Sequence, residues 1–172
     1  MSHRALVAYE RRDGRYDVHT ARWGGLDCRL ARAITATDPY AGGEVDPVPR
    51  VLSRPFECVL TMVDLGRHEA LYRVRAGYRV TTFLPLWVEL AHYLGERPDD
   101  GTEHSGVLVA VETPGEAREL RRWLRAAKAT LAEGVRDGVI ATAEARTILD
   151  RALRRRVDGR ELFEPGASRT DE

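Results

Sequence analysis

Residues 3–25, HRALVAYERRDGRYDVHTARWGG, predict the element around which the rest of the fold is built. Two runs rich in strand-forming residues, 3–10 and 15–22, flank a segment that ends in Asp13-Gly14. An Asp-Gly pair between two such runs is strong turn chemistry. The stretch therefore indicates a β-hairpin that opens the domain and leaves through Trp23-Gly24-Gly25.

A four-residue loop would place Glu10 opposite Arg15 and would set the register of this hairpin. Because side chains alternate along a strand, one face then carries eight residues with an apolar middle and a polar end. These are His3, Ala5, Val7, Tyr9, Tyr16, Val18, Thr20 and Arg22. A slip of one residue would bury Asp17 and His19 instead, so the pattern favours this register.

The composition is that of a globular domain with balanced charge. The 172 residues include 27 cationic and 27 acidic side chains, and Lys128 is the only lysine. A formal net charge of zero argues against a generally basic nucleic-acid binder and makes a homo-oligomer plausible. The length predicts a single α+β domain over residues 1–157 and a polar C-terminal tail over 158–172.

The cysteines and the hydropathy pattern indicate a cytoplasmic protein. Cys28 and Cys58 form no CxxC motif and no metal-ligand spacing, so free thiols in a reducing compartment are expected. There is no apolar signal segment at the N-terminus, and no run approaches the roughly 20 apolar residues that span a bilayer. Neither a membrane association nor a cofactor is predicted.

The middle of the chain alternates predicted helices and strands. Its strongest signal is a second hairpin around Ala76-Gly77-Tyr78, with Val74 opposite Val80 and Gly77 at positive φ. The other expected elements are a helix over 27–37 that Asp27 begins, an irregular exposed loop over 38–50, a strand over 56–63, a helix over 86–94 that ends at Gly95, an acidic surface loop over 96–105 and a buried strand over 106–112.

The C-terminal third predicts an αα-hairpin. Thr113-Pro114-Gly115-Glu116 has the spacing of a capping box with proline at the first helical position. The helix should run to about Arg136, and a second helix should cover 142–156. Val139 and Ile140 should dock in the core between them. The expected architecture is a mostly antiparallel sheet of about six strands with this αα-hairpin on one face or at one end.

The arginines of the two C-terminal helices are the first candidate binding surface. Eleven cations and five anions lie between residues 118 and 156. The candidate residues are Arg118, Arg122, Arg125, Arg154, Arg155 and Arg156. Such a face would bind phosphates of a nucleic acid or an acidic protein. The same pattern is also typical of a solvated face with arginines at a helix C-terminus.

The open end of the first hairpin is the second candidate site. His3, His19, Arg22 and Trp23 lie there, beneath the 38–50 loop. No histidine has another histidine, a cysteine or a carboxylate at a recognisable metal spacing, so no metal site is predicted. In the register above, His3 and His19 point to opposite faces. Glycines 24 and 25 follow a strand and precede a helix, and a structural turn is favoured over anion binding there.

The N-terminal run also resembles a known family. The matching residues are His3 to Glu10, Asp13-Gly14, Tyr16, His19 and Trp23-Gly24-Gly25, with a looser likeness at Glu69-Ala70-Leu71-Tyr72 and in the αα-hairpin. They resemble a family of small haloarchaeal proteins classed as a domain of unknown function. The resemblance is clearest over the first thirty or so residues. It implies a cytoplasmic protein of an extreme halophile, with no assigned activity or site residues.

Three functional hypotheses follow. The favoured one is a non-catalytic binding or regulatory module that uses the arginine-rich helical face. The second is a small hydrolase or transferase with its site near His19 and Trp23. The third is an oligomeric structural component.

Overall fold

The computed structural model describes residues 3–97 and 106–165, which form a seven-stranded sheet with helices on both faces. The strand order is β3-β2-β1-β4-β5-β6-β7, and the central β1–β4 pair is parallel whereas the other pairs are antiparallel. The strands are β1 (Arg4–Glu10), β2 (Tyr16–Ala21), β3 (Val51–Arg54), β4 (His68–Arg75), β5 (Arg79–Trp87), β6 (Gly106–Val111) and β7 (Leu162–Phe163). The prediction of an α+β fold with a mostly antiparallel sheet is confirmed.

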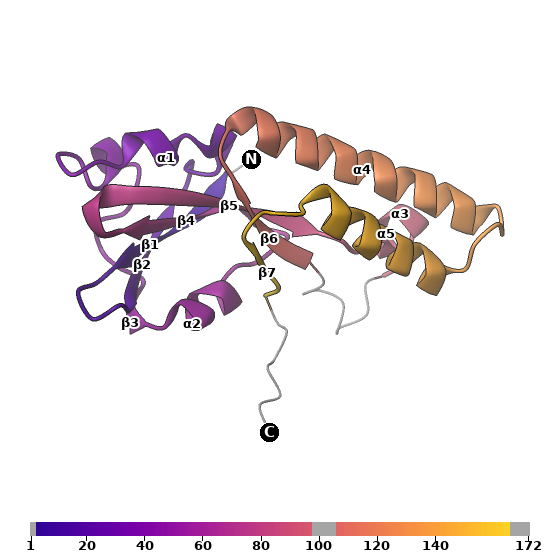
Figure 1. The fold of residues 1–172 in the computed structure, drawn as a ribbon, viewed down its shortest axis with the longest axis horizontal. Coiled ribbons are helices and arrows are strands. Elements are labelled where there is room, and N and C mark those ends of the chain that lie inside the picture. The colour runs from indigo at the N-terminus through magenta and orange to yellow at the C-terminus, as the bar shows by residue number, and fades with distance from the viewer. Residues whose placement is uncertain (1–2, 98–105, 166–172) are drawn as a thin grey trace, which may run out of the picture.

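The helices cover both faces of the central strands of the sheet. They are α1 (Leu30–Ala33), α2 (Phe56–Thr61), α3 (Ala91–Leu94), α4 (Pro114–Arg136) and α5 (Thr142–Arg156), with short 3₁₀ turns η1 (Leu26–Cys28), η2 (Ala41–Gly43) and η3 (Ala76–Tyr78). Figure 1 shows α1 and α4 above the sheet and α2 below it. Both faces of the central strands are therefore covered, and Leu6, Val7 and Leu71 are fully buried.

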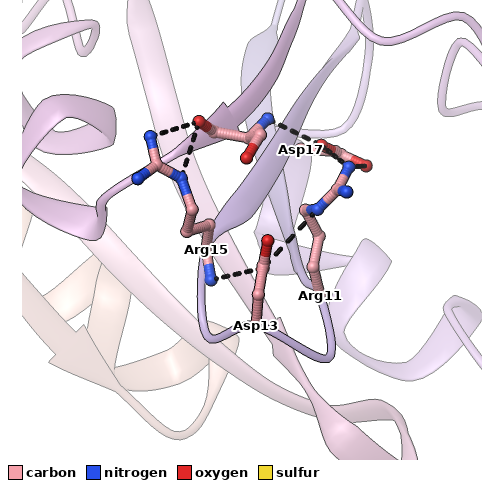
Figure 2. Close-up of polar contacts among 5 residues, drawn as sticks. Arg11, Asp13, Arg15 and Asp17 are labelled. Atoms are coloured by element: carbon pink, nitrogen blue, oxygen red, sulfur yellow. Dashed lines mark hydrogen bonds and ion pairs between the residues drawn. The ribbon is translucent and has the colours of Figure 1, made fainter.

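The register of the first hairpin differs from the prediction by one residue. Glu10 pairs with Tyr16, and Val7 with His19, because the loop has five residues instead of four. Figure 2 shows the polar network that holds this loop. The backbone N–H of Arg11 donates to the Arg15 carbonyl at 2.7 Å, and the N–H of Arg15 donates to the Asp13 carboxylate at 3.1 Å.

The same network joins the hairpin to the neighbouring strand (Figure 2). The Arg15 guanidinium donates to the Ser53 carbonyl, and the Ser53 N–H donates to Asp17 at 2.8 Å. The corrected register places Tyr16 and Val18 on the opposite face from Val7 and Tyr9. The predicted single apolar face is wrong because both faces of β1 and β2 are covered, so the alternation of polar and apolar residues no longer selects a register.

The second hairpin has the predicted register. Val74 pairs with Val80, and the like-charged Arg75 and Arg79 lie opposite each other. Gly77 has a φ of 75°, a conformation that glycine adopts at little cost.

The predicted strand over residues 56–63 is wrong, because this segment forms helix α2. Phe56, Val59, Leu60 and Val63 recur at the helical spacing and pack against the underside of the sheet. The alternation of Phe56, Cys58, Leu60 and Met62 suggested a strand, but Cys58 is exposed. Both cysteines are free thiols, as expected, and Cys28 is buried.

Two predicted helices are much shorter in the structure. Asp27 and Cys28 have positive φ values of 49° and 53°, so the helix expected from residue 27 is only Leu30–Ala33. The helix expected over 86–94 is only Ala91–Leu94, because pairing with β6 keeps Trp87 in β5. Gly95 ends that helix at a φ of 71°, as predicted.

The C-terminal helices match their predicted limits. The Thr113 hydroxyl accepts from the Glu116 N–H at 3.2 Å, and the Glu116 carboxylate accepts from the Glu112 N–H at 2.8 Å. In the predicted capping box the Glu116 carboxylate would accept from the N–H of Thr113, whereas here it accepts from the N–H of Glu112, one residue earlier. Val139 is 76% exposed, so its predicted docking in the core is wrong, whereas Ile140 packs against the α4–α5 core.

Three connecting segments complete the domain. The 38–50 loop contributes Ala41 and Val45 to the core, so it is not simply exposed. Of the predicted acidic loop, residues 98–105 lie outside the described residues. Beyond residue 157 the chain adds strand β7 to the sheet edge, where Phe163 packs against Phe56 and Phe83.

Candidate anion-binding groove

Two adjoining concavities lie at the end of the sheet where β1 and β4 begin. The smaller has a volume of about 470 Å³ and is lined by the segment after α2 and by Trp87. The larger has a volume of about 640 Å³ and lies between the start of β1, the start of β4 and α4. Both are lined by Gly66 and Arg67. We refer to the two together as the groove.

The larger concavity is rich in arginine. Arg4 comes from β1, Arg67 from the turn before β4 and Arg121 from the first half of α4. The Arg121 guanidinium donates to the Glu69 carbonyl at 2.7 Å, which fixes its position beside the sheet. Arg67 lies 3.4 Å from Asp64, but its side chain is 73% exposed and is free to reorient toward a ligand.

His68 contributes a neutral donor to the same concavity. Its Nδ1 accepts a hydrogen bond from the Asp64 N–H at 2.9 Å, so the proton of the neutral ring lies on Nε2. Burial lowers the pKa of His68, chiefly because the charged imidazolium would lose hydration. The ring is therefore neutral near pH 7 and presents one N–H.

Glu69 lines the larger concavity and connects it to His3 and Trp23. His3 Nδ1 donates to both Glu69 carboxylate oxygens, at 2.9 and 2.8 Å, and its ring lies 6.1 Å from the Trp23 ring. Trp23 is 54% exposed. Gly25 makes this arrangement possible, because a Cβ there would lie only 2.6 Å from the Glu69 Cβ. The Trp-Gly-Gly segment is thus a close-packed turn that presents Trp23.

The structure brings together only part of the predicted hairpin site. His3 and Trp23 are neighbours, and Arg22 is exposed, but His19 lies elsewhere. His19 is 4% exposed, its Nδ1 donates to the Asp46 carbonyl at 2.8 Å, and its ring contacts Tyr9 and Tyr40. The catalytic hypothesis for this region stays a prediction. Within residues 3–97 and 106–165 no three His, Cys, Asp or Glu side chains are grouped to hold a metal ion.

Half of the predicted arginine face is engaged in ion pairs. Arg118 pairs with Asp27 at 2.7 Å, Arg154 with Asp150 and Glu164, and Arg156 with Glu119. Arg122, Arg125 and Arg155 are exposed, and none of them has a polar partner among the described residues. Arg125 lies four positions after Arg121 in α4 and extends the charge of the groove along the helix, whereas Arg122, one position after Arg121, lies on a different side of the helix.

Sequence reasoning missed Arg4, Arg67, His68 and Trp87 as groove residues. Arg67 and His68 precede a predicted strand, and Arg4 is the second residue of another, but nothing local shows that these strand ends lie side by side. That proximity comes from the parallel pairing of Arg4 with His68, which joins residues far apart in the chain. Arg121 is one of the eleven cations between residues 118 and 156. Its position beside the sheet depends on how α4 is oriented, which the sequence does not show.

Comparison with known proteins identifies a family. No curated protein matches the chain, and no solved structure does. None of the described helices has the length and apolar character needed to cross a membrane. A family of unknown function, DUF6735, matches residues 1–44 and 41–163, so its model covers the first hairpin, the groove and the C-terminal helices. The chain therefore belongs to the DUF6735 family.

Proposed function

We propose that this protein is a non-catalytic module that binds single-stranded nucleic acid in the groove. One observation carries the proposal: Arg4, Arg67 and Arg121 line a concavity that is joined to an exposed tryptophan. Glu69 of this concavity binds His3, and the His3 ring lies 6.1 Å from the ring of Trp23, while the half-buried Trp87 lines the adjoining concavity. Cationic side chains that follow a backbone, with aromatic rings on which bases stack, are the usual means of holding a single strand.

The arginines and the tryptophan would contact different parts of the strand. Guanidinium groups pair with phosphates and are insensitive to base identity. An exposed indole offers a flat surface to an unpaired base, worth about 1–3 kcal/mol per stacked base. Bases in a duplex are stacked on each other and are not available to Trp23. The combination therefore favours a single strand over a duplex.

The flank of α4 lengthens the proposed site. Arg125 is exposed and lacks a polar partner among the described residues. It supplies positive charge next to Arg121 without the cost of breaking an ion pair. An acidic protein would use the same arginines, but it would not need Trp23, so the tryptophan distinguishes the two partners.

The cellular setting belongs to the same proposal. A cytoplasmic protein with free thiols would meet RNA and transient single-stranded DNA. The N-terminal resemblance to haloarchaeal proteins adds a physical constraint, because salt weakens phosphate contacts strongly. Stacking on Trp23 is much less sensitive to salt and would carry a larger share of the affinity there.

Fluorescence anisotropy with labelled oligonucleotides tests the proposal on the full chain. We expect the wild-type protein to bind a single strand more tightly than a duplex at low salt. Trp23→Ala should weaken binding about tenfold, and Arg67→Ala should weaken it and lower the salt slope by about 0.7. Arg155→Ala is the control, since this arginine is also exposed but lies in α5, away from the groove.

Two results would contradict the proposal. One is the absence of binding to any oligonucleotide at low salt. The other is binding that Trp23→Ala leaves unchanged while arginine substitutions abolish it, which would indicate an acidic protein partner and not a nucleic acid.

A further inference from the structure

We propose that the end of the sheet that carries the two hairpin turns binds the phosphate backbone of a duplex nucleic acid. This surface, the hairpin end, comprises residues 10–17, 54–57 and 75–79. It lies at the opposite end of β1 and β4 from the groove, so it does not depend on strand binding there. Figure 1 shows both turns at the left of the molecule, whereas α4 and α5 extend to the right. The Glu10 carboxylate joins the turns by accepting from the Ala76 N–H at 3.3 Å.

The register of the sheet aligns three arginines of the hairpin end in one row. Tyr16 of β2 pairs with Glu10 of β1 and, on its other side, with Arg54 of β3. Glu10 lies beside Arg75 of β4, because the preceding residues of these two parallel strands pair. Arg75 in turn pairs with Arg79 of β5. Paired residues present their side chains on the same face of a sheet, and four strand spacings separate β3 from β5, or about 19 Å.

The arginines of this row are available to a ligand. Arg54 and Arg75 are exposed, and their guanidinium groups form no hydrogen bond or ion pair with another described residue. The Arg79 guanidinium is also exposed and donates to the Ala76 carbonyl at 3.4 Å. Arg12, in the first turn, is exposed and likewise lacks a polar partner in the described chain. A ligand can therefore contact these arginines without breaking an ion pair.

The carboxylates at the hairpin end do not balance its arginines. Asp13 and Asp17 both pair with Arg11, at 3.6 and 3.2 Å (Figure 2). Beside the row, Glu161 is held through both oxygens by the buried Arg73. The cations of the hairpin end are Arg11, Arg12, Arg15, Arg54, Arg75 and Arg79, and its anions are Glu10, Asp13, Asp17 and Glu57. Six positive charges thus lie among four negative ones, and a surplus of two remains after every carboxylate of these segments is counted.

The pairing of Arg75 with Arg79 indicates an anionic ligand. Like charges directly opposite each other on neighbouring strands lower stability, and an anion between the two guanidinium groups replaces this repulsion with two attractive contacts. A row of about 19 Å matches a series of phosphates better than one small anion. Tyr78, at 37%, is the one exposed aromatic side chain of the hairpin end. Stacking on bases therefore has little surface here, which favours the backbone of a duplex over an unpaired strand.

Fluorescence anisotropy with short labelled duplexes tests this inference on the full-length protein. We expect binding at low salt that does not depend on the duplex sequence and that weakens steeply as salt is added. Arg79→Glu should lower the duplex affinity about fivefold and reduce the salt slope by about 0.9, because it removes a phosphate contact.

Arg155→Glu is the matched control, because it makes the same change of net charge at an exposed arginine of α5. The control should leave the duplex affinity within about twofold of the wild-type value, since only long-range electrostatics changes. Thermal unfolding of Arg79→Glu separates binding from folding. This variant should be at least as stable as the wild type, because the substitution replaces a like-charged pair with Arg75 by an oppositely charged one.

The outcomes separate the hairpin end from the groove. Trp23→Ala reports on the groove and should weaken single-strand binding far more than duplex binding. If no duplex binds, or if Arg79→Glu and Arg155→Glu weaken duplex binding equally, the inference is wrong while strand binding in the groove stands. If only the single-strand measurements fail, the proposed function is wrong and duplex binding at the hairpin end stands. Displacement of the duplex by polyglutamate as effectively as by unlabelled duplex would indicate an acidic protein and would overturn the phosphate assignment.

Discussion

Arg73 and the groove arginines show what burial does to one kind of side chain. Arg73, in β4, is 4% exposed and its guanidinium lies 5.1 and 4.9 Å from the centres of the Phe56 and Phe83 rings. It donates to both oxygens of Glu161 at 2.9 and 2.7 Å. Arg67, in the turn just before the same strand, is 73% exposed and pairs with Asp64 at 3.4 Å.

The difference indicates that Arg73 contributes to stability, whereas Arg67 is available for the binding that we propose. Removing water from a guanidinium costs several kcal/mol, and Arg73 recovers this cost only through a fixed carboxylate and two aromatic rings. The exposed Arg67 guanidinium stays hydrated in the folded protein, so folding carries no desolvation cost for it. It can therefore exchange water for a ligand. The predictions that follow test this division.

Glu161→Ala should have the largest effect on stability. It leaves Arg73 buried without its carboxylate, and breaking such a pair costs about 3 kcal/mol. Arg73 also lowers the pKa of Glu161 by hydrogen bonding to its ionised form. The pair therefore stabilises the fold above the ordinary carboxyl pKa of about 4.3 and loses this contribution as the pH falls through the lower value. Urea unfolding at pH 7 and pH 3 measures both effects.

Glu164→Ala is the control for that measurement. Glu164 follows in the same segment, but it pairs with the exposed Arg154. Exposed pairs contribute about 0.2–1 kcal/mol, so the control should change stability little. Equal losses for the two variants would show that the segment, and not the burial of Arg73, determines the cost.

Lys128 should produce the next largest effect, and it depends on pH. Burial against Trp87 and Tyr93 lowers the pKa of this lysine from 10.5 to about 8. Below pH 8 the Lys128 ammonium is present in both the folded and the unfolded state, and its loss of hydration on burial lowers the stability of the fold. Above about pH 8 the folded protein loses this proton before the unfolded chain does, so stability should rise with pH, by about 2.5 kcal/mol between pH 7 and pH 10.

Lys128→Met removes the titrating group and should abolish most of that rise. The measurement is the free energy of unfolding at intervals from pH 7 to pH 10, with both proteins compared at each pH. A rise that persists unchanged in the variant would assign the effect to another group. Leu would be a poorer replacement, since methionine follows the path of the lysine stem more closely.

Arg67→Ala should have the smallest effect on stability and a clear effect on binding. We expect a change within about 0.5 kcal/mol in the free energy of unfolding, because the side chain is exposed. The affinity of the variant protein for a single strand should nevertheless fall about fivefold. A variant that unfolds more easily by 2 kcal/mol or more would erase the contrast with Arg73.

Local signals in the sequence predicted some elements well. Thr113 with Glu116, Gly77 between Val74 and Val80, and Gly95 each act through neighbours within a few residues, and all three features are present. The long amphipathic helix α4 followed for the same reason. Short segments were less certain, since Phe56 to Met62 suits a strand or a helix equally and only the packing under the sheet selects the helix.

The groove was less predictable than the elements that form it. The arginine count pointed to α4 and α5, but ion pairs with Asp27, Glu119 and Glu164 occupy half of the candidates. The proposed site instead joins Arg121 to strand ends from two other parts of the chain. Trp23 and His3 remained candidates, whereas His19 became a buried donor to the Asp46 carbonyl.

The sequence by itself determined the cap at Thr113, the turn at Gly77 and the helix end at Gly95, because these residues act on the backbone beside them. It also determined the α+β class and the neutral overall charge. Tertiary structure decided the register of the first hairpin, the parallel pairing of β1 with β4 and the environment of each arginine. These depend on burial and on partners distant in the chain, which set the energy of a charged group far more than its neighbours in sequence do.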